Sequence, residues 1–255
     1  MFHLLHNHNF ERVVALDINA ELILCYKTLQ TDVEKVIAEL KKLRDQYPGH
    51  KEHEERKAFF YGVREDWNAS VGKVLSLKKS DQVKRTAQTI FLNRTCFNGL
   101  FRVNSKGHFN VPIGGYKNPK ILDEGNLRNV SKCIDCVEFY HSDYKGAKEY
   151  LGKRTLMYFD PPYRPLTTSS SFTAYAKSGF NDENQVELAE FCRTLHRQSV
   201  SFMLSNSDPK NADATDDFFD LLYRGFQIDR VSAYRAINSK ASGRGKISEI
   251  LVRNY

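Results

Sequence analysis

The sequence has no long apolar run, and none approaches the roughly 18 residues that a membrane-spanning helix requires. The first residues, Met1 to His8, lack the basic region, apolar core and small-residue cleavage site of a secretion signal. Cysteine is scarce, and the 5 scattered thiols suit a reduced state better than a disulfide framework. We therefore expect a cytoplasmic protein with no membrane partner.

Candidate metal ligands are also few. Cys133 and Cys136 have the spacing of zinc ligands, but no second Cys or His pair follows at a suitable distance. His3, His6 and His8 belong to what we expect to be a frayed polar start. The sequence therefore predicts no metal site.

What the sequence has in excess is positive charge. Lys and Arg total 38 against 31 Asp and Glu, which gives a net charge of +7 and an isoelectric point near 9.0. This balance favours a polyanionic partner such as nucleic acid. With 41% apolar and 27% charged residues, the chain is globular and long enough for one large domain or two small ones.

Strands alternate with helices along much of the chain, which predicts an α/β fold with a mostly parallel sheet covered on both faces. The last two predicted strands, 226–231 and 247–252, are joined by a loop alone, so we expect an antiparallel hairpin at the edge. The other predicted elements are strands at 13–19, 136–144, 155–160 and 199–204 and helices at 20–46, 81–95, 144–151, 181–195 and 214–223.

An acid ends the first predicted strand. Asp17 follows the apolar run 13–16 and precedes the helix that begins at Ala20. An acid at this point of a βαβ unit commonly binds the ribose hydroxyls of a nucleotide-like cofactor. The alternative is that Asp17 simply caps the helix.

Residues 155–163 combine an apolar strand with an acid, two prolines and a tyrosine. Pro161 cannot donate to a sheet, so the strand must end at Asp160, where an open α/β sheet usually binds its ligand. A carboxylate, a free carbonyl and the ring of Tyr163 suit a planar ligand that carries an amino group, such as a nucleobase. The alternative is an ordinary exit from strand to turn.

The composition changes between the helix predicted at 20–46 and the strand predicted at 136–144. Residues 50–68 are strongly charged and then aromatic, and residues 107–119 are rich in Gly, Pro and Asn. Turn formers interleaved with aromatic and basic residues suit a surface that inserts into nucleic acid. The alternative is a satellite subdomain with an ordinary hairpin. The basic loop 243–246 is a further candidate for contact with a DNA backbone.

Residues 160–163 resemble the catalytic motif of amino-group DNA methyltransferases that use S-adenosylmethionine. Residues 92–94, 97–104 and 109–117 resemble the target-recognition segment of DNA adenine methylases of the GATC-modifying type, and Phe172–Tyr175 and Leu204–Asp208 resemble later motifs. The similarity follows the family order over almost the whole chain. It implies a Rossmann-like methyltransferase sheet in a catalytic domain of residues 1–48 and 136–255, with a mainly helical target-recognition domain inserted at 49–135.

The resemblance also implies roles for single residues. Asp160 and the carbonyl of Pro161 accept hydrogen bonds from the target amino group, and Tyr163 stacks on the flipped base beside Pro162. The implied cofactor-binding residues are Asp17 at the ribose, Asp143 and Tyr144 near the adenine, and Asp160. The implied DNA-binding residues are Arg94, Phe97, Asn98, Leu100, Arg102, Asn104, Pro112, Tyr116 and Lys117. Among these, Phe97 resembles the aromatic that enters the base stack.

The sequence departs from the family pattern in two places. Gly115 stands where GATC enzymes commonly carry a basic residue, which removes one expected DNA contact. The family also opens with a strand and a glycine loop that cradles the methionine part of the cofactor, and Met1 stands after that point. We expect one central strand to be missing, with three explanations open: a start further upstream, a piece supplied by another chain, or a remnant.

We therefore expect a site-specific DNA adenine methyltransferase that moves a methyl group from S-adenosylmethionine to the amino group of a flipped adenine in GATC. It is expected to act as a monomer on double-stranded DNA, near the nucleoid of a bacterium or phage-infected cell, in restriction-modification or in DNA replication and repair. The alternatives are a truncated DNA-binding remnant without catalysis and a related enzyme acting on RNA or another base. Asp160 before the two prolines argues against the last.

Overall fold

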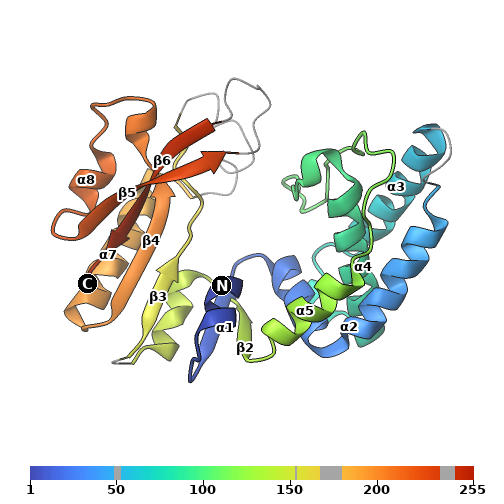
Figure 1. Cartoon of the computed structure of the whole chain (residues 1–255), viewed down its shortest axis with the longest axis horizontal. Helices are drawn as coiled ribbons and strands as arrows, with labels where there is room; N and C mark the ends of the chain where they lie inside the picture. Colours follow the sequence, from blue (N-terminus) through green and yellow to red (C-terminus); the bar gives the residue numbers. More distant parts are fainter. Residues whose placement is uncertain (49–52, 153, 167–179, 236–244) are drawn as a thin grey trace. The chain divides into compact units, whose positions relative to one another are not determined.

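The computed structural model describes residues 1–48, 53–152, 154–166, 180–235 and 245–255. These residues form two compact units, Met1–Gly146 and Ala147–Tyr255 (Figure 1). Two features with predicted roles, Phe172–Tyr175 and residues 243–244 of the basic loop, lie outside the described residues. None of the helices in the described ranges is both long and apolar enough to cross a membrane.

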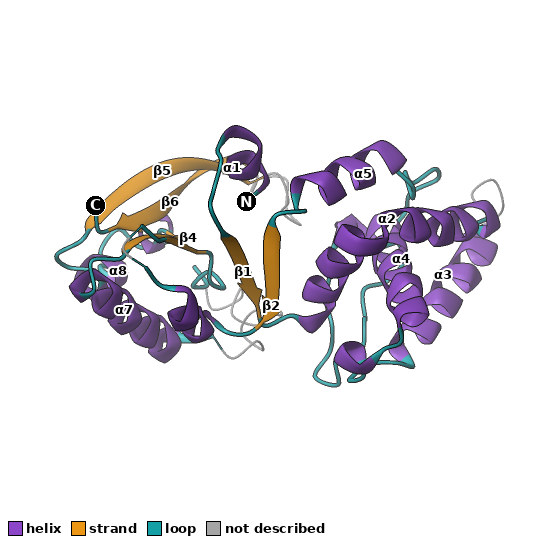
Figure 2. Cartoon of the chain, turned by 90° about the horizontal axis from the view of Figure 1, so that it is seen from below, coloured by secondary structure: helices purple, strands orange, loops and turns teal. Residues whose placement is uncertain are grey.

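The first unit joins a group of packed helices to a pair of parallel strands (Figure 2). Its long second helix packs mainly against the fourth and fifth, as the helical spacing of its apolar residues predicts. The elements are α1 (Phe2–Asn7), β1 (Val13–Asp17), α2 (Ala20–Gln46), α3 (His53–Asn68), η1 (Val74–Ser76), α4 (Lys79–Thr95), η2 (Phe97–Gly99), α5 (Glu124–Cys133), β2 (Val137–His141) and η3 (Tyr144–Tyr150), which runs on into the second unit.

Three helices of this unit, α1, α3 and α5, were not among the predicted elements. The start of the chain, predicted to be frayed, forms the short helix α1, although none of its side chains is buried. The charged stretch after residue 50 forms α3, for which no helix was predicted. Phe60, Val63 and Trp67 supply its buried face, and the indole N–H of Trp67 donates to Thr89 Oγ1 at 2.9 Å. The helix forms because this face completes the core against α4.

The second unit is a four-stranded sheet in the order β3-β4-β6-β5, with α7 packed against β4 (Figure 2). β3 and β4 are parallel, whereas β6 pairs antiparallel with both β4 and β5. The predicted antiparallel hairpin is confirmed, with β5 at the edge. The elements are β3 (Leu156–Phe159), α7 (Asp182–Arg197), β4 (Ser201–Ser207), η5 (Pro209–Asn211), α8 (Phe218–Leu222), β5 (Gln227–Arg235) and β6 (Gly245–Arg253).

Two predicted helices are altered in the structure. Residues 144–150 form the 3-10 helix η3 rather than an α-helix. The helix predicted at 214–223 is shortened to α8, because the side chains of Asp213 and Asp216 accept the backbone N–H groups of Thr215 and Phe218. Such local bonds hold the chain in turns and compete with the helix.

The predicted α/β fold of Rossmann-like methyltransferase type is confirmed, since helices alternate with parallel strand pairs and an antiparallel hairpin closes the chain. Within the described residues the strands form two sheets, and β1 and β3 each pair on one side only. The acids with predicted roles, Asp17, Asp143 and Asp160, lie at the carboxyl ends of the parallel strands β1, β2 and β3. These ends are where α/β sheets usually bind ligands.

Candidate functional site

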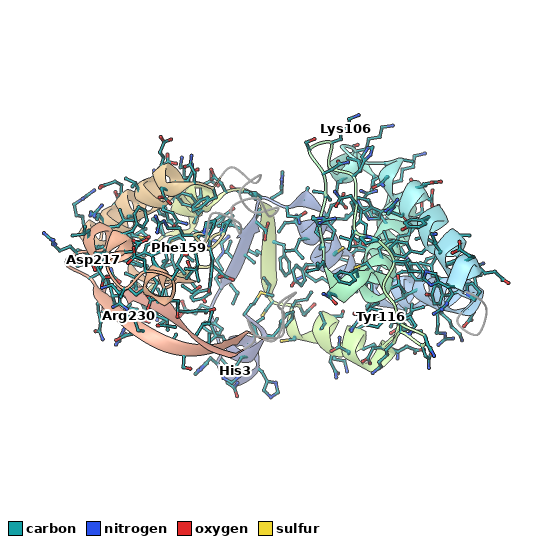
Figure 3. The ribbon with its side chains drawn as sticks, turned by 90° about the horizontal axis from the view of Figure 1, so that it is seen from above. His3, Lys106, Tyr116, Phe159, Asp217 and Arg230 are labelled. Carbon is teal, nitrogen blue, oxygen red and sulfur yellow. The ribbon has the colours of Figure 1, made fainter. Side chains whose placement is uncertain are left out.

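The predicted catalytic acid comes directly after β3. Phe159, the last residue of the strand, lies inside the second unit with its ring edge-on to those of Phe191 and Phe202 (Figure 3). The strand thus ends at the acid, as the two prolines predict. Asp160 is exposed, and Ser205 Oγ on β4 donates to its Oδ1 at 3.0 Å. Its Oδ2 has no hydrogen-bond partner in the described part of the chain, so this oxygen is available to a ligand.

Side chains of α7 and β4 hold the loop after Asp160 by bonding to its backbone. Gln185 on α7 donates to the carbonyl of Pro162 at 3.1 Å, and Arg164 N–H donates to Asn206 Oδ1 on β4 at 3.0 Å. Ser207 Oγ donates to the carbonyl of Arg164 at 2.6 Å. Gln185 and Arg164 were missed in the sequence. The available signal was an amide at 185, three and four residues before buried Leu188 and Ala189 and therefore on the apolar face of α7.

Tyr163 and Arg164 differ in their environments. Tyr163 is half-buried, and its hydroxyl donates to Glu249 Oε2 at 3.5 Å. Burial raises the pKa of this phenol, which therefore stays neutral at physiological pH. The Arg164 guanidinium pairs with Asp182 and Asp216 and lies 4.3 Å from the centroid of the Phe218 ring. These contacts fix both side chains on the flanks of the loop.

Asp17 and Asp143 lie at the carboxyl ends of the paired strands β1 and β2 in the first unit. Asp17 is opposite His141 in the register, and its carbonyl accepts the N–H of Ser142 at 3.1 Å. Asn19, not Asp17, caps α2, so the helix-capping alternative for Asp17 does not hold. The next residue, Ile18, is 64% exposed. A carboxylate beside an exposed apolar side chain suits a nucleoside.

Asp143 has a structural role of its own. Its Oδ1 accepts the backbone N–H groups of Lys145 and Gly146 at 3.0 and 3.3 Å, and these bonds start η3. Tyr144 opens this 3-10 helix, directly beside the acid. The structure therefore brings Asp17, Asp143 and Tyr144 to one end of the β1–β2 pair.

Residues 96–114 form the turn-rich hairpin that the sequence offered as one alternative. Isolated antiparallel bridges join Cys96 to Ile113 and Val103 to Phe109. At its base, Asn98 and Gly99 have φ of 55° and 62°, a left-handed pair that reverses the chain. Phe97, just before the reversal, is 51% exposed. Leu100, Phe101 and Val103 on the same hairpin are 38–39% exposed, and a group of exposed apolar side chains is the kind of feature that marks a contact surface.

Each predicted DNA-binding residue is exposed on this unit. Arg94, Asn98 and Tyr116 line one polar pocket of about 350 Å³. In the hairpin turn, the backbone N–H groups of Lys106 and His108 donate to Asn104 Oδ1. Lys106 lies on the outside of this turn (Figure 3). The full exposed set is Arg94, Phe97, Asn98, Leu100, Arg102, Asn104, Pro112, Tyr116 and Lys117. At the departure from the family pattern, a Cβ on Gly115 would meet no atom within 4 Å.

The returning strand of the hairpin is held by α3. Arg56 Nη1 donates to the carbonyl of Tyr116 at 2.9 Å. Asn68 accepts the N–H of Phe109 at 2.8 Å and donates to its carbonyl at 3.3 Å, as a neighbouring strand would. No role was predicted for these residues. Their separation of 12 positions places them about 120° apart around the helix, so helical periodicity gives no local signal for the contact.

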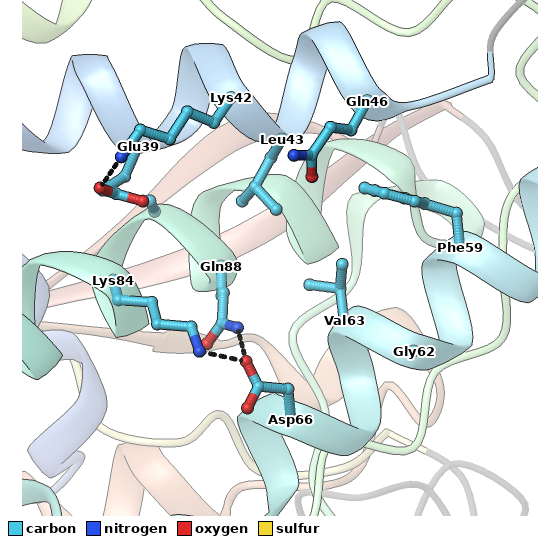
Figure 4. A pocket seen from close by; sticks show the side chains of 11 residues that line it. Glu39, Lys42, Leu43, Gln46, Phe59, Gly62, Val63, Asp66, Lys84 and Gln88 are labelled. Carbon is cyan, nitrogen blue, oxygen red and sulfur yellow. Dashed lines mark hydrogen bonds and ion pairs between the residues drawn. The ribbon is translucent and has the colours of Figure 1, made fainter.

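A larger pocket of about 430 Å³ lies among α2, α3 and α4 (Figure 4). Its charged groups are paired within the pocket: Lys84 with Asp66 at 2.7 Å and Lys42 with Glu39 at 2.6 Å. It contains none of the predicted site residues.

The chain is similar to known DNA methyltransferases. The family model of the D12 class N6 adenine-specific DNA methyltransferases matches residues 1–237. The Type II methyltransferase M.MjaIII of Methanocaldococcus jannaschii is 48% identical over 256 residues, which cover 100% of this chain and 84% of that protein. The Type II methyltransferase M1.LlaDCHI of Lactococcus lactis subsp. cremoris is 35% identical over 247 residues (96% and 80%). The DNA adenine methylase of Vibrio cholerae is 32% identical over 246 residues (96% and 80%).

Proposed function

The chain belongs to the D12 class of N6 adenine-specific DNA methyltransferases, and we propose that it transfers the methyl group of S-adenosylmethionine to a flipped adenine in GATC duplexes. That it is an adenine-specific DNA methyltransferase follows from the family and its relatives. The observation that carries the proposed site is Asp160, which is exposed at the end of β3 and oriented by Ser205.

The chemistry requires two acceptors at the adenine amino group. Its lone pair is delocalised into the ring, so the nitrogen is a poor nucleophile. Asp160 and the carbonyl of Pro161 accept hydrogen bonds from the two amino hydrogens and favour the tetrahedral geometry in which the nitrogen lone pair attacks a methyl group. As the nitrogen–carbon bond forms, the bond from that carbon to sulfur breaks and one amino proton is released. Ser205 holds one carboxylate oxygen and leaves the other for the base. Flipping the base costs a few kcal/mol, part of which stacking on Tyr163 returns.

The cofactor supplies a sulfonium methyl group when bound. For its adenosine part, Asp17 would accept hydrogen bonds from the ribose hydroxyls, and Asp143 with Tyr144 would hold the adenine. The meeting of these residues at one end of β1 and β2 supports this assignment, as does exposed Ile18. The fourth proposed cofactor-binding residue is Asp160, directly after β3.

The exposed hairpin serves as the DNA-reading surface of a recognition domain at 49–135, while 1–48 and 136–255 form the catalytic domain. Phe97 enters the base stack, and Leu100, Arg102 and Pro112 reach base edges. Arg94, Asn98, Asn104, Tyr116 and Lys117 contact the backbone or flanking bases. The enzyme acts as a monomer in the cytoplasm at the nucleoid, and the Type II names of two relatives favour restriction-modification over replication and repair.

The test is methyl transfer from radiolabelled S-adenosylmethionine to a GATC duplex, with a duplex lacking the adenine amino group as substrate control. Asp160→Ala is expected to lower the rate by about 100-fold or more without loss of DNA binding, because it removes a preorganised acceptor. Asp45→Ala removes an exposed carboxylate from the end of α2 and is the matched control. Undiminished transfer by Asp160→Ala contradicts the assignment. DNA retardation without transfer by the unaltered chain favours the DNA-binding alternative, and transfer to RNA alone favours an RNA enzyme.

A further inference from the structure

Two amide side chains are buried beside the catalytic loop. Gln185 of α7 is 1% exposed and Asn206 of β4 is 0% exposed. Asn206 Nδ2 donates to Gln185 Oε1 at 3.2 Å. Each amide also bonds to the backbone of the loop, Gln185 at Pro162 and Asn206 at Arg164. Neither side chain takes part directly in the proposed chemistry.

The direction of these bonds is fixed by backbone groups at both ends. The N–H groups of Arg164 and Ser207, at 3.0 and 2.9 Å, can only donate, so the Asn206 oxygen must face them. The Asn206 nitrogen then faces the Gln185 oxygen, and the Gln185 nitrogen faces the carbonyl of Pro162. Because the donors and acceptors agree along the whole chain of bonds, both positions require an amide. We call these bonds the amide relay.

Resting on the proposed function, we propose that Gln185 and Asn206 are positioning residues for methyl transfer, acting through the amide relay on Pro161 and Tyr163. The ring of a proline fixes φ but leaves ψ free, and ψ sets the direction of its carbonyl. Gln185 holds the carbonyl of Pro162, and Asn206 holds the N–H of Arg164, two residues further on. The carbonyl of Pro161 accepts no hydrogen bond from the described residues and stays free for the adenine amino group.

The relay is tested with two variants and a matched control. Gln185→Met keeps the length of the side chain and its apolar neighbours but removes both bonds. Gln185→Glu keeps the acceptor for Asn206 and removes the donor to Pro162. Gln198→Glu makes the same chemical change at an exposed position just after α7. Circular dichroism and thermal unfolding establish that each variant is folded.

The expected result is a lower kcat with little change in KM for DNA or cofactor. Displacing a reacting group by about 1 Å costs up to about 100-fold, so we expect kcat to fall by about 10- to 100-fold in both Gln185 variants. Gln198→Glu keeps the rate of the unaltered chain. A loss confined to KM, or kcat within about twofold in a folded Gln185→Met, overturns the relay.

A second measurement does not depend on activity. The amide hydrogen of Arg164 donates to a fully buried acceptor, so its exchange with solvent is slow in the unaltered chain. In Gln185→Met the Asn206 amide loses its partner, and we expect exchange at Arg164 to rise roughly tenfold or more. Unchanged exchange overturns the relay. Absence of transfer by the unaltered chain with every DNA overturns the proposed function instead, and the exchange result still decides the relay.

Discussion

The loop after β3 and the hairpin at 96–114 are both irregular segments held by side chains that bond to their backbone. They differ in how far those bonds are exposed to solvent. The bonds of the loop come from side chains that are at most 1% exposed, Gln185, Asn206 and Ser207. Within the hairpin, by contrast, Asn104 and Asn110 hold exposed groups. A buried bond cannot be exchanged for one to water, whereas an exposed bond exchanges at little net cost.

This difference matches the role proposed for each segment. Methyl transfer requires two acceptors fixed within a fraction of an ångström. Reading DNA requires a surface that adapts to groove width and to an opened base stack. The exposed ring of Phe97 and the buried ring of Phe159 show the same division, one on the proposed contact surface and one in the core.

The largest expected difference is in the reactivity of two buried thiols, one at the hairpin and one on the helix that holds the loop after β3. Burial raises the pKa of Cys96, beside Phe97, to about 11 and that of Cys192, on α7 with Gln185, to about 12. At pH 8 the reactive thiolate of either is scarcer than that of a free thiol by roughly 100-fold or more. If exposed bonds let the hairpin open locally, iodoacetamide modifies Cys96 well before Cys192.

Mass spectrometry of peptides from native protein measures both rates, with exposed Cys136 as the internal standard. Both buried thiols should react faster as pH rises toward their pKa values, because only the thiolate attacks. Bound GATC duplex should slow Cys96 alone. Modification of Cys192 before Cys96 would show that the catalytic region is the looser one.

A smaller effect is expected from Phe97→Ala. The ring is half exposed and contributes little to the core, so stability should change little. Loss of one stacked aromatic typically removes about 1–3 kcal/mol, so the Kd for GATC duplex should rise about tenfold. Fluorescence anisotropy measures this. Phe10→Ala removes a similarly exposed ring, at 49%, from outside the hairpin and should leave the Kd unchanged. Equal effects of the two would remove Phe97 from the interface.

Structural features that depend on neighbours along the chain could be predicted from the sequence. The bounds of α2 follow from its apolar spacing, and the end of β3 follows from Pro161. The side chains that hold the two segments could not be found in this way. Gln185 bonds to a residue 23 positions away, and Asn68 to one 41 positions away. Such bonds depend on which backbone groups the folded chain leaves unpaired.

The smallest effect is expected where an exposed bond of the hairpin is removed. Arg102 Nε donates to Asn110 Oδ1 at 2.8 Å, which orients a guanidinium proposed to read a base edge. In Asn110→Ala, water replaces the lost oxygen because Arg102 is exposed. The rate on GATC should therefore fall no more than about threefold, far less than in Gln185→Met.

Discrimination is the more sensitive measure of this change. A guanidinium that is less well oriented should separate GATC from a duplex with one altered base pair less sharply, and transfer to both duplexes measures it. Asn129→Ala removes an exposed amide from α5, outside the hairpin and outside the proposed DNA-binding set, and should leave the ratio of the two rates unaltered. A loss in Asn110→Ala as large as that in Gln185→Met would mean that both segments are equally rigid. The distinction between a fixed catalytic loop and an adaptable reading surface would then fail.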